Sequence, residues 1–196
     1  MDSGYLHTIK ELAVRPGHMI REYLQGKRGK HRDPMLMLVI IGGLCSVLYN
    51  HYHIKTLASL DLSELKGEME VFSLKFFVLA FFGYSLILSL FDYLVFRYKG
   101  YNYFELLVMN IFACIEILFL FILLAPLLIF IDSSLLNKVM RVTSIITIFT
   151  YLYYVRYQFF EASGNRKALF RVLLIMVFIL ALFALVGWKT WLGILA

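Results

Sequence analysis

Five long apolar runs, separated by short polar segments, dominate the sequence. They lie at about residues 34–54, 72–96, 104–131, 142–160 and 172–188. Because an α-helix rises 1.5 Å per residue, about 20 apolar residues span the hydrocarbon core of a bilayer. We therefore predict an all-α fold, an integral membrane helical bundle of about five transmembrane helices formed by residues 34–196. Cytoplasmic amphipathic helices in residues 1–33 are expected to precede it.

The composition agrees with a membrane protein. Of the 196 residues, 61% are hydrophobic and 16% are charged, whereas soluble domains average about 25% charged residues. A formal net charge of +6 would also suit a nucleic-acid-binding protein. Here, however, the cations stand at the ends of the apolar runs. We therefore expect no nucleic-acid partner and assign the positive charge to membrane orientation.

The distribution of Lys and Arg predicts which side of the membrane each end faces. With the N-terminus in the cytoplasm, the inner segments hold thirteen of these residues and the outer segments hold six. Cations accumulate on the cytoplasmic side, which favours five spans and a cytoplasmic N-terminus. The fourth run is the weakest, because only residues 142–155 are free of charge. If it were re-entrant, the C-terminus would return to the inside.

A basic amphipathic segment, residues 15–34, leads into the first run. Pro16 and Gly26 are placed to begin and end a short helix, since proline suits the first turn and glycine the left-handed position after the last one. The apolar residues between them fall near one face: Met19, Ile20, Tyr23 and Leu24. We expect residues 1–14 to form a similar helix. The pair is predicted to lie on the anionic inner leaflet of the membrane.

The cations of this segment are candidates for contacts with lipid headgroups or with a partner protein. They are Arg15, Arg21, Lys27, Arg28, Lys30 and Arg32. Each cation near an anionic membrane surface contributes about 1 kcal/mol of attraction. A second interpretation is that these charges only fix the orientation of the protein.

Residues 8–28 read T-I-K-E-L-A-V-R-P-G-H-M-I-R-E-Y-L-Q-G-K-R, and Pro34 stands before the first apolar run. This pattern resembles a bacterial family of multi-span membrane proteins described only as a domain of unknown function. The resemblance implies a location in the bacterial inner membrane and supplies no activity. Longer members of that family carry an N-terminal zinc ribbon of paired cysteines. This sequence starts without the ribbon, so no metal role is carried over.

Glu116 is the sharpest candidate for an intramembrane functional residue, because its position places it near the middle of the third span. A carboxyl group at this depth is costly and usually faces the bundle interior or water, which makes it a functional hypothesis by default. The alternative is a structural hydrogen bond to the fourth span, through Thr143, Thr147 or Thr150.

Asp92, Glu105 and Arg156 form a second polar set, predicted near the inner interface. An ion network that joins Asp92 or Glu105 with Arg156, or with Arg97, would connect three spans. Such a network is more typical of packing than of catalysis. A lipid headgroup pocket built from Arg156, Tyr154, Lys27 and Arg28 is the alternative.

The sequence predicts no cofactor and no metal site. Cys45 and Cys114 both lie inside apolar runs, which excludes a disulfide framework or a CxxC site. His51 and His53, with Glu68 and Glu70 on the same predicted side, suit an interfacial belt better than a metal site. The pairs Gly42/Ser46 and Ser85/Ser89 have the small-xxx-small spacing of closely packed helices.

Three classes of function fit these features. The first is a membrane scaffold or accessory subunit that engages anionic lipid, a partner protein or a second copy of itself through the basic N-terminal segment. The second is a transporter or binder of a small molecule or lipid that uses Glu116. The third is an intramembrane enzyme acting on lipids. Because no catalytic constellation is recognisable in the sequence, we favour the first.

Overall fold

The computed structural model describes the backbone of residues 4–27, 29, 31–52, 77–129, 134–160 and 166–195. Side chains are described for residues 4–27, 29, 31–48, 78–124, 142–160 and 167–181. All regular structure in this part of the chain is helical. The elements are α1 (Tyr5–Val14), α2 (Pro16–Leu24), α3 (Pro34–Tyr52), α5 (Phe77–Phe96), the short 3-10 helix η2 (Arg97–Lys99), α6 (Tyr103–Ile129), α7 (Ser134–Phe159) and α8 (Arg166–Leu195).

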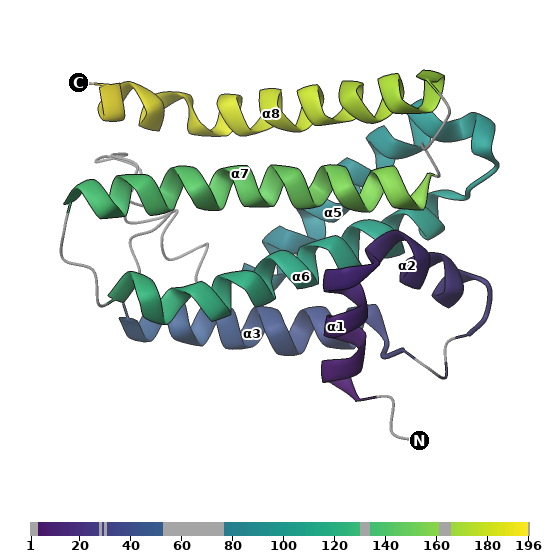
Figure 1. The fold of residues 1–196 in the computed structure, drawn as a ribbon, viewed down its shortest axis with the longest axis horizontal. Coiled ribbons are helices and arrows are strands. Elements are labelled where there is room, and N and C mark those ends of the chain that lie inside the picture. Colours follow the sequence, from purple (N-terminus) through teal and green to yellow (C-terminus); the bar gives the residue numbers. More distant parts are fainter. Residues whose placement is uncertain are drawn as a thin grey trace.

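The five long helices correspond to the five predicted apolar runs, and they alternate in direction. Helices α3, α6 and α8 run one way, while α5 and α7 run the other way (Figure 1). Helix α6 lies at the centre, where it packs against α3, α5 and α7 and against both short helices. The end at which α3, α6 and α8 begin also holds α1 and α2, and we call it the capped end (Figure 1).

Helices α7 and α8 begin earlier than predicted, at Ser134 and Arg166. The predicted boundaries at residues 142 and 172 followed the apolar content. In both helices the helical structure instead includes the charged residues that precede the apolar run. Helix α6 also continues past Pro126 to Ile129, so this proline does not mark the end of the helix.

Two of the predicted spans meet the length and hydropathy of a membrane crossing within the described residues. They are Val78–Lys99 and Tyr103–Leu124, and a shorter apolar helix covers Pro34–Leu48. Only 22% of the first stretch is buried, against 56% of the second. The first stretch is mostly exposed, unlike the core helix of a soluble protein, whereas the second is mostly buried. The two stretches together are a weak indication of membrane association.

Aromatic rings and small residues bring the long helices together. Phe91 of α5 stacks on Phe178 of α8, and Phe96 stacks on Phe160, each pair with ring centroids 3.6 Å apart. At Gly42 of α3, an added Cβ would lie 2.9 Å from Val78 Cγ2 of α5. This close approach agrees with the close packing of helices that the spacing predicts at Gly42.

Local chemistry sets the ends of the short helices. Pro16 begins α2, as predicted. Because it lacks an N–H, it cannot continue the hydrogen bonding of α1, and that helix ends before it. After α2, Gly26 adopts φ +96°. The Gly26 N–H donates to the carbonyl oxygen of Tyr23, and the Lys27 N–H donates to that of Glu22. This is the glycine-dependent Schellman ending. Asp33 caps α3, since its Oδ1 accepts from two backbone N–H groups at 2.8 and 3.1 Å.

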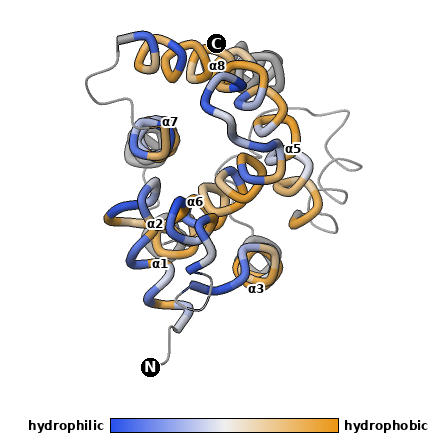
Figure 2. Tube along the Cα trace, turned by 90° about the vertical axis from the view of Figure 1, so that its right-hand side faces the viewer, coloured by the Kyte–Doolittle hydropathy of each residue, from blue (hydrophilic) through white to orange (hydrophobic). Residues whose placement is uncertain are grey.

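The apolar faces of α1 and α2 are buried against the bundle rather than presented to a membrane surface. Ile9, Leu12, Met19, Ile20 and Tyr23 are all at least 91% buried, and the Tyr23 ring meets Phe112 of α6 edge-on at 5.3 Å. The prediction that both helices rest on the membrane through these faces is corrected. Figure 2 shows the two short helices beside α6, and α2 also packs against α7.

Gly17 makes the contact between α2 and α7 possible. Its backbone N–H donates to Gln158 Oε1 at 3.1 Å. A Cβ at this position would lie 2.3 Å from the backbone nitrogen of Phe159, a distance that no side chain tolerates. Two structural features therefore account for the R-P-G pattern: Pro16 breaks the helix between α1 and α2, and Gly17 allows the backbone of α2 to contact α7.

Candidate functional site

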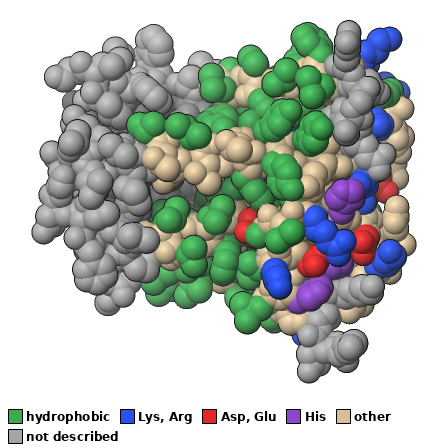
Figure 3. Space-filling view, viewed as in Figure 1, with side chains coloured by type: hydrophobic (Ala, Val, Ile, Leu, Met, Phe, Trp, Pro, Cys, Tyr) green, Lys and Arg blue, Asp and Glu red, His purple; other side chains and the backbone are tan. Residues whose placement is uncertain are grey.

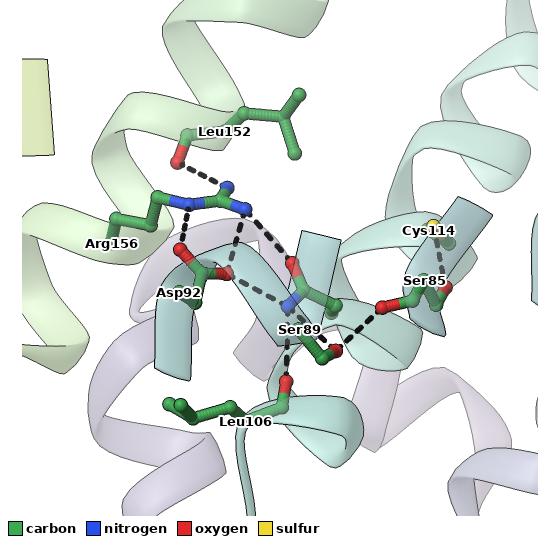
Figure 4. A network of polar contacts seen from close by, with 8 residues as sticks. Ser85, Ser89, Asp92, Leu106, Cys114, Leu152 and Arg156 are labelled. Carbon is green, nitrogen blue, oxygen red and sulfur yellow. Dashed lines mark hydrogen bonds and ion pairs between the residues drawn. The ribbon is translucent and has the colours of Figure 1, made fainter. Parts of the chain in front are cut away.

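A buried polar cluster joins α5, α6 and α7 toward the capped end (Figure 4). Arg156 donates to the Asp92 carboxylate from Nε at 3.1 Å and from Nη2 at 3.0 Å. Arg156 Nη2 also donates to Asn110 Oδ1 at 2.9 Å, and Asn110 Nδ2 donates to Asp92 Oδ2 at 2.8 Å. All three side chains are at most 1% exposed. We call this closed, charge-neutral group the polar clamp.

Helical spacing extends the polar clamp along α5 and α6. Ser85, Ser89 and Asp92 are four and three residues apart, so they share one face of α5. Asn110 Nδ2 lies 3.1 Å from Ser89 Oγ, and Ser85 Oγ lies 3.3 Å from Cys114 Sγ (Figure 4). Both serines also donate to the carbonyl group four residues earlier, which satisfies their protons inside the helix. Small residues thus leave room for polar contacts between the helices.

The polar clamp is suited to holding helices rather than to reacting. Both Asp92 oxygens accept hydrogen bonds from Arg156, and Arg156 Nη1 donates to the carbonyl oxygen of Leu152 at 3.3 Å. With both oxygens bonded to Arg156 and one of them also to Asn110, the Asp92 carboxylate is occupied by its partners within the bundle. The cluster therefore fixes how α5, α6 and α7 are rotated relative to one another.

Glu105 lies apart from the polar clamp. Its Oε2 accepts a hydrogen bond from the backbone N–H of Asn102 at 2.8 Å, in the first turn of α6. Tyr154, which the headgroup-pocket hypothesis includes, instead donates to the carbonyl oxygen of Val14 at 3.1 Å. Of the predicted polar set, the structure brings Asp92 and Arg156 together and leaves Glu105 outside.

Glu116 occupies a separate, less satisfied position. It lies at the midpoint of α6, and its side chain is 2% exposed. Its Oε2 is buried without a hydrogen-bond partner among the described residues. The predicted threonine partners do not fill this role. Thr143, Thr147 and Thr150 are exposed, and the Thr147 hydroxyl donates within α7 to the carbonyl group of Thr143.

Several N-terminal cations are engaged by nearby acids. Arg15 pairs with Glu11 of α1 and lies 3.9 Å from Glu22 of α2, while Lys27 lies 3.7 Å from the other Glu22 oxygen. The hydrogen bond with Glu11, together with its charge, raises the pKa of Arg15. About half of each cationic side chain remains exposed, so these pairs leave both cations accessible to anions.

Other cations of the segment meet aromatic rings. Arg21 Nη2 lies 2.8 Å from His18 Nδ1. The Arg32 guanidinium lies over the Tyr5 ring, 5.2 Å from its centroid, a geometry that cation–π attraction favours. Arg28 and Lys30, which belong to the same predicted contact set, lie outside the described residues.

His31 is buried between α1 and the start of α3. It is 7% exposed, and its two ring nitrogens have no hydrogen-bond partner in the described part of the chain. Its ring centroid lies 6.1 Å from that of His7. Burial, followed by the charge of His7, lowers the pKa of His31. Beside it, the Arg32 N–H donates to the Thr8 hydroxyl at 3.3 Å, so the connection before α3 is tied to α1.

No three His, Cys, Asp or Glu side chains come together as a metal site over the described ranges. The predicted set of His51, His53, Glu68 and Glu70 lies outside the described side chains. Cys45 packs against α6, with its thiol 3.3 Å from the carbonyl oxygen of Leu118.

Sequence reasoning missed the residues that connect the predicted ones. Asn110 completes the polar clamp, yet an amide in an apolar run gives no signal of which charge it faces. Gln158 and Tyr151, both on α7, bond to the backbones of α2 and α1. The small-xxx-small spacing of Ser85 and Ser89 was the one available signal that this face of α5 approaches a neighbour.

Comparison with known proteins adds one match. The model of a family described as "Protein of unknown function (DUF3667)" matches residues 2–45. Nothing matches among the curated proteins or the solved structures. The matched region covers α1, α2 and the first part of α3. The chain is therefore similar to an uncharacterised family over the segment whose helix break and backbone contact are described above.

Proposed function

We propose that the chain is a five-span protein of the bacterial inner membrane, with its N-terminus in the cytoplasm. It acts as a non-enzymatic scaffold or accessory subunit that engages anionic lipid headgroups through the capped end. A partner protein or a second copy would then assemble on this anchored surface.

The observation that carries this proposal is that the exposed surface is apolar around the middle of the helix bundle and charged at the capped end. Large apolar side chains stand exposed on the outer faces of four helices, for example Val47 of α3, Leu94 of α5, Ile146 of α7 and Val177 of α8. In Figure 3, hydrophobic side chains cover the middle of the visible face, and Lys, Arg, Asp, Glu and His gather toward the capped end. Apolar surface of this extent is buried by lipid or by protein.

The alternating helices explain why cations from distant parts of the sequence meet. The C-terminal end of α5 and the N-terminal ends of α6 and α8 lie at the end of the bundle that holds α1 and α2 (Figure 1). The cations described there include Lys10, Arg15, Lys27, Arg32, Arg97, Lys99, Lys167 and Arg171. An end with this excess of cations suits the anionic inner leaflet.

Stabilisation by defined lipids tests the proposal. We expect phosphatidylglycerol to raise the unfolding temperature of the purified protein more than phosphatidylethanolamine does, and salt to weaken the difference. The triple variant Lys10→Gln/Lys27→Gln/Arg32→Gln should lose this difference, since three cations contribute about 3 kcal/mol at about 1 kcal/mol each. Native mass spectrometry should show the loss of retained anionic lipid.

A matched variant distinguishes a local site from a general charge effect. Lys138→Gln/Arg141→Gln neutralises two cations at the opposite end of α7 and should keep the preference for phosphatidylglycerol. If the triple variant also kept that preference, lipid engagement by the capped end would be refuted.

A second candidate function is the binding or transport of a small molecule or lipid through Glu116. The observation that favours it is the buried Oε2 that lacks a partner among the described residues. Glu116→Gln and Glu116→Ala should release any small ligand that copurifies with the wild-type protein. Full retention by both variants would argue decisively against this function.

A further inference from the structure

A series of stacked side chains leads from the core of the bundle to Arg171 of α8. Phe160 stacks on Phe96, with ring centroids 3.6 Å apart, and Phe96 stacks in turn on Tyr98 of η2, with centroids 6.0 Å apart. The guanidinium carbon of Arg171 lies 3.7 Å from the centroid of the Tyr98 ring. Phe96 and Phe160 are at most 1% exposed. The ring beneath Arg171 is therefore anchored in the core.

This stacking leaves the N–H groups of Arg171 available to a ligand. They lie in the plane of the guanidinium, so a ring that covers one face does not occupy them. Arg171 is partly exposed, and no carboxylate pairs with it among the described residues. Arg15 and Lys27, by contrast, each pair with an acid. Arg171 thus presents an oriented cation that has no anion of its own in this part of the chain.

Exposed apolar side chains lie next to Arg171 on α8. Phe170, Leu174 and Val177 are spaced by four and three residues, so they share one face of the helix, and they are 42–68% exposed. We call this face the apolar strip. Because α8 begins at the capped end (Figure 1), the apolar strip extends from that end toward the middle of the bundle. A charged group at Arg171 and an apolar chain on the strip can therefore belong to one ligand.

We propose that Arg171 binds the phosphate group of one anionic phospholipid whose acyl chains cover the apolar strip. A guanidinium holds a phosphate through two parallel N–H···O bonds, whereas the ammonium group of lysine acts as a point charge. Arg97 and Lys99 flank Tyr98 in η2 and add positive charge to this corner of the capped end. The site rests on the proposed function, since it requires that α8 crosses the membrane and that the capped end faces the inner leaflet.

A lipid suits this site better than a free phosphate ion does. If α8 crosses the bilayer, acyl chains cover the apolar strip. The lipid to which these chains belong has its phosphate at the polar end of the strip, where Arg171 lies. A free phosphate ion would have to leave bulk water for one partly exposed guanidinium, and such screened contacts contribute little.

Lipid titration of the full chain tests the site. Native mass spectrometry of the protein in a mild detergent gives the dissociation constant of the first bound phosphatidylglycerol. Arg171→Lys keeps the charge but loses the paired donors, so we expect about tenfold weaker binding, the effect of one lost hydrogen bond to a charged group. Tyr98→Leu removes the supporting ring and should weaken binding about two- to fivefold. Tyr98→Phe keeps the ring and should bind as the wild-type protein does.

Arg97→Lys is the matched control, because it makes the same exchange at an exposed arginine of the same corner. It should keep the wild-type dissociation constant. Equal unfolding temperatures of wild-type and Arg171→Lys protein without lipid would separate lost binding from lost folding. A diacylglycerol with the same chains lacks the phosphate and should not compete with phosphatidylglycerol. Millimolar inorganic phosphate should not displace the lipid.

Two results would overturn the site. One is an equal affinity of wild-type and Arg171→Lys protein for phosphatidylglycerol. The other is competition by diacylglycerol or displacement by inorganic phosphate, since the chains alone or the anion alone would then account for binding. A failure of the proposed function would look different, because the wild-type protein would bind phosphatidylglycerol and phosphatidylethanolamine equally well.

Discussion

The polar clamp places a cation and an anion where either one alone would be costly. Asp92 and Arg156 are both fully buried, and Asn110 bonds to each of them. Removing one charge leaves the other without compensation, whereas removing both restores an apolar contact. Buried pairs of this kind often add little net stability and instead favour one arrangement of the helices over others.

We predict that Arg156→Met and Asp92→Leu each destabilise the protein by on the order of 3 kcal/mol, the cost of an unpaired buried charge. The double variant should lose less than the sum of the two. The measurement is the free energy of unfolding in mixed micelles of increasing sodium dodecyl sulfate content, arranged as a double-mutant cycle.

Glu105→Gln is the control for this cycle, because Glu105 bonds to Asn102 outside the polar clamp. It should change the free energy of unfolding by less than about 0.5 kcal/mol, as surface substitutions usually do. Strictly additive losses for Asp92 and Arg156 would show that the pair is not energetically coupled.

His31 gives the N-terminal segment a pH dependence of its own. Burial lowers the pKa of His31 while the connection before α3 is packed against α1. A state in which this connection has opened therefore binds more protons in the interval below the ordinary histidine pKa of about 6.5. The packed state is then fully stable above about pH 6.5 and loses stability as the pH falls. Glu11, Glu22 and Arg15 also act on the His31 ring, and the two acids partly oppose the effect.

We predict that amide hydrogen exchange at Arg32, whose N–H donates to Thr8, accelerates between pH 6.5 and 5 after correction for the intrinsic rate. His31→Gln should flatten this response, because it removes the titrating group. His18→Gln, at an exposed position of α2, should leave the response unchanged. Unchanged protection of Arg32 in the wild-type protein at pH 5 would contradict the prediction.

At the scale of elements, α2 depends on a backbone contact that one methyl group would block. We predict that Gly17→Ala separates α2 from α7 and destabilises the protein by about 1–3 kcal/mol, the usual cost of overpacking. The reason is the 2.3 Å approach of an added Cβ to the Phe159 nitrogen. Thermal unfolding and protease cleavage between α2 and α3 would measure both effects.

Gly43→Ala is the matched control in α3, since nothing lies within 4 Å of a Cβ there. Alanine stabilises a helix interior by about 0.5–1 kcal/mol relative to glycine, so this variant should unfold at a slightly higher temperature. Equal effects of the two substitutions would show that the Gly17 contact carries no special cost.

The positions of most helices follow from local chemistry that the sequence displays. Apolar runs indicate the five long helices, and Pro16 and Gly26 bound α2 because of their backbone properties. The faces of the helices are harder to assign. Met19 and Ile20 suit a membrane surface as well as a helix bundle, and only the position of α7 decides between them. That position depends on contacts between residues 141 apart in the sequence, which no local pattern encodes.

At the scale of the whole molecule, the five-span arrangement is a prediction with a definite sidedness. In a Cys45→Ala/Cys114→Ser background, His18→Cys should react with a membrane-permeant reagent only. Ser63→Cys, in the connection that this topology places outside, should react with a membrane-impermeant reagent. A C-terminal tag should be accessible to its antibody from the same side. A C-terminus accessible only from the cytoplasm would mean that one predicted span does not cross.

The pairing of charges inside the bundle is the part of the molecule that sequence reasoning reached least well. Asp92 and Arg156 were recognisable as possible partners because both are charged and both are predicted to lie near the inner interface. Glu105 satisfied the same criteria, but it lies in the first turn of α6, where its side chain bonds to the Asn102 N–H. The choice between the two acids depends on how α5, α6 and α7 are placed and rotated, a property of the assembled helices.

The contact between Gly17 and Gln158 also has a consequence for biosynthesis. The ribosome adds 141 residues between these two positions, which takes on the order of 10 s at about 5–20 residues per second. Throughout that interval α1 and α2 exist without the helix that covers their apolar faces. An amphipathic helix in that condition binds the nearest lipid surface. With the proposed topology, we expect the nascent N-terminal segment to rest on the inner leaflet first and to transfer to the protein when α7 is made.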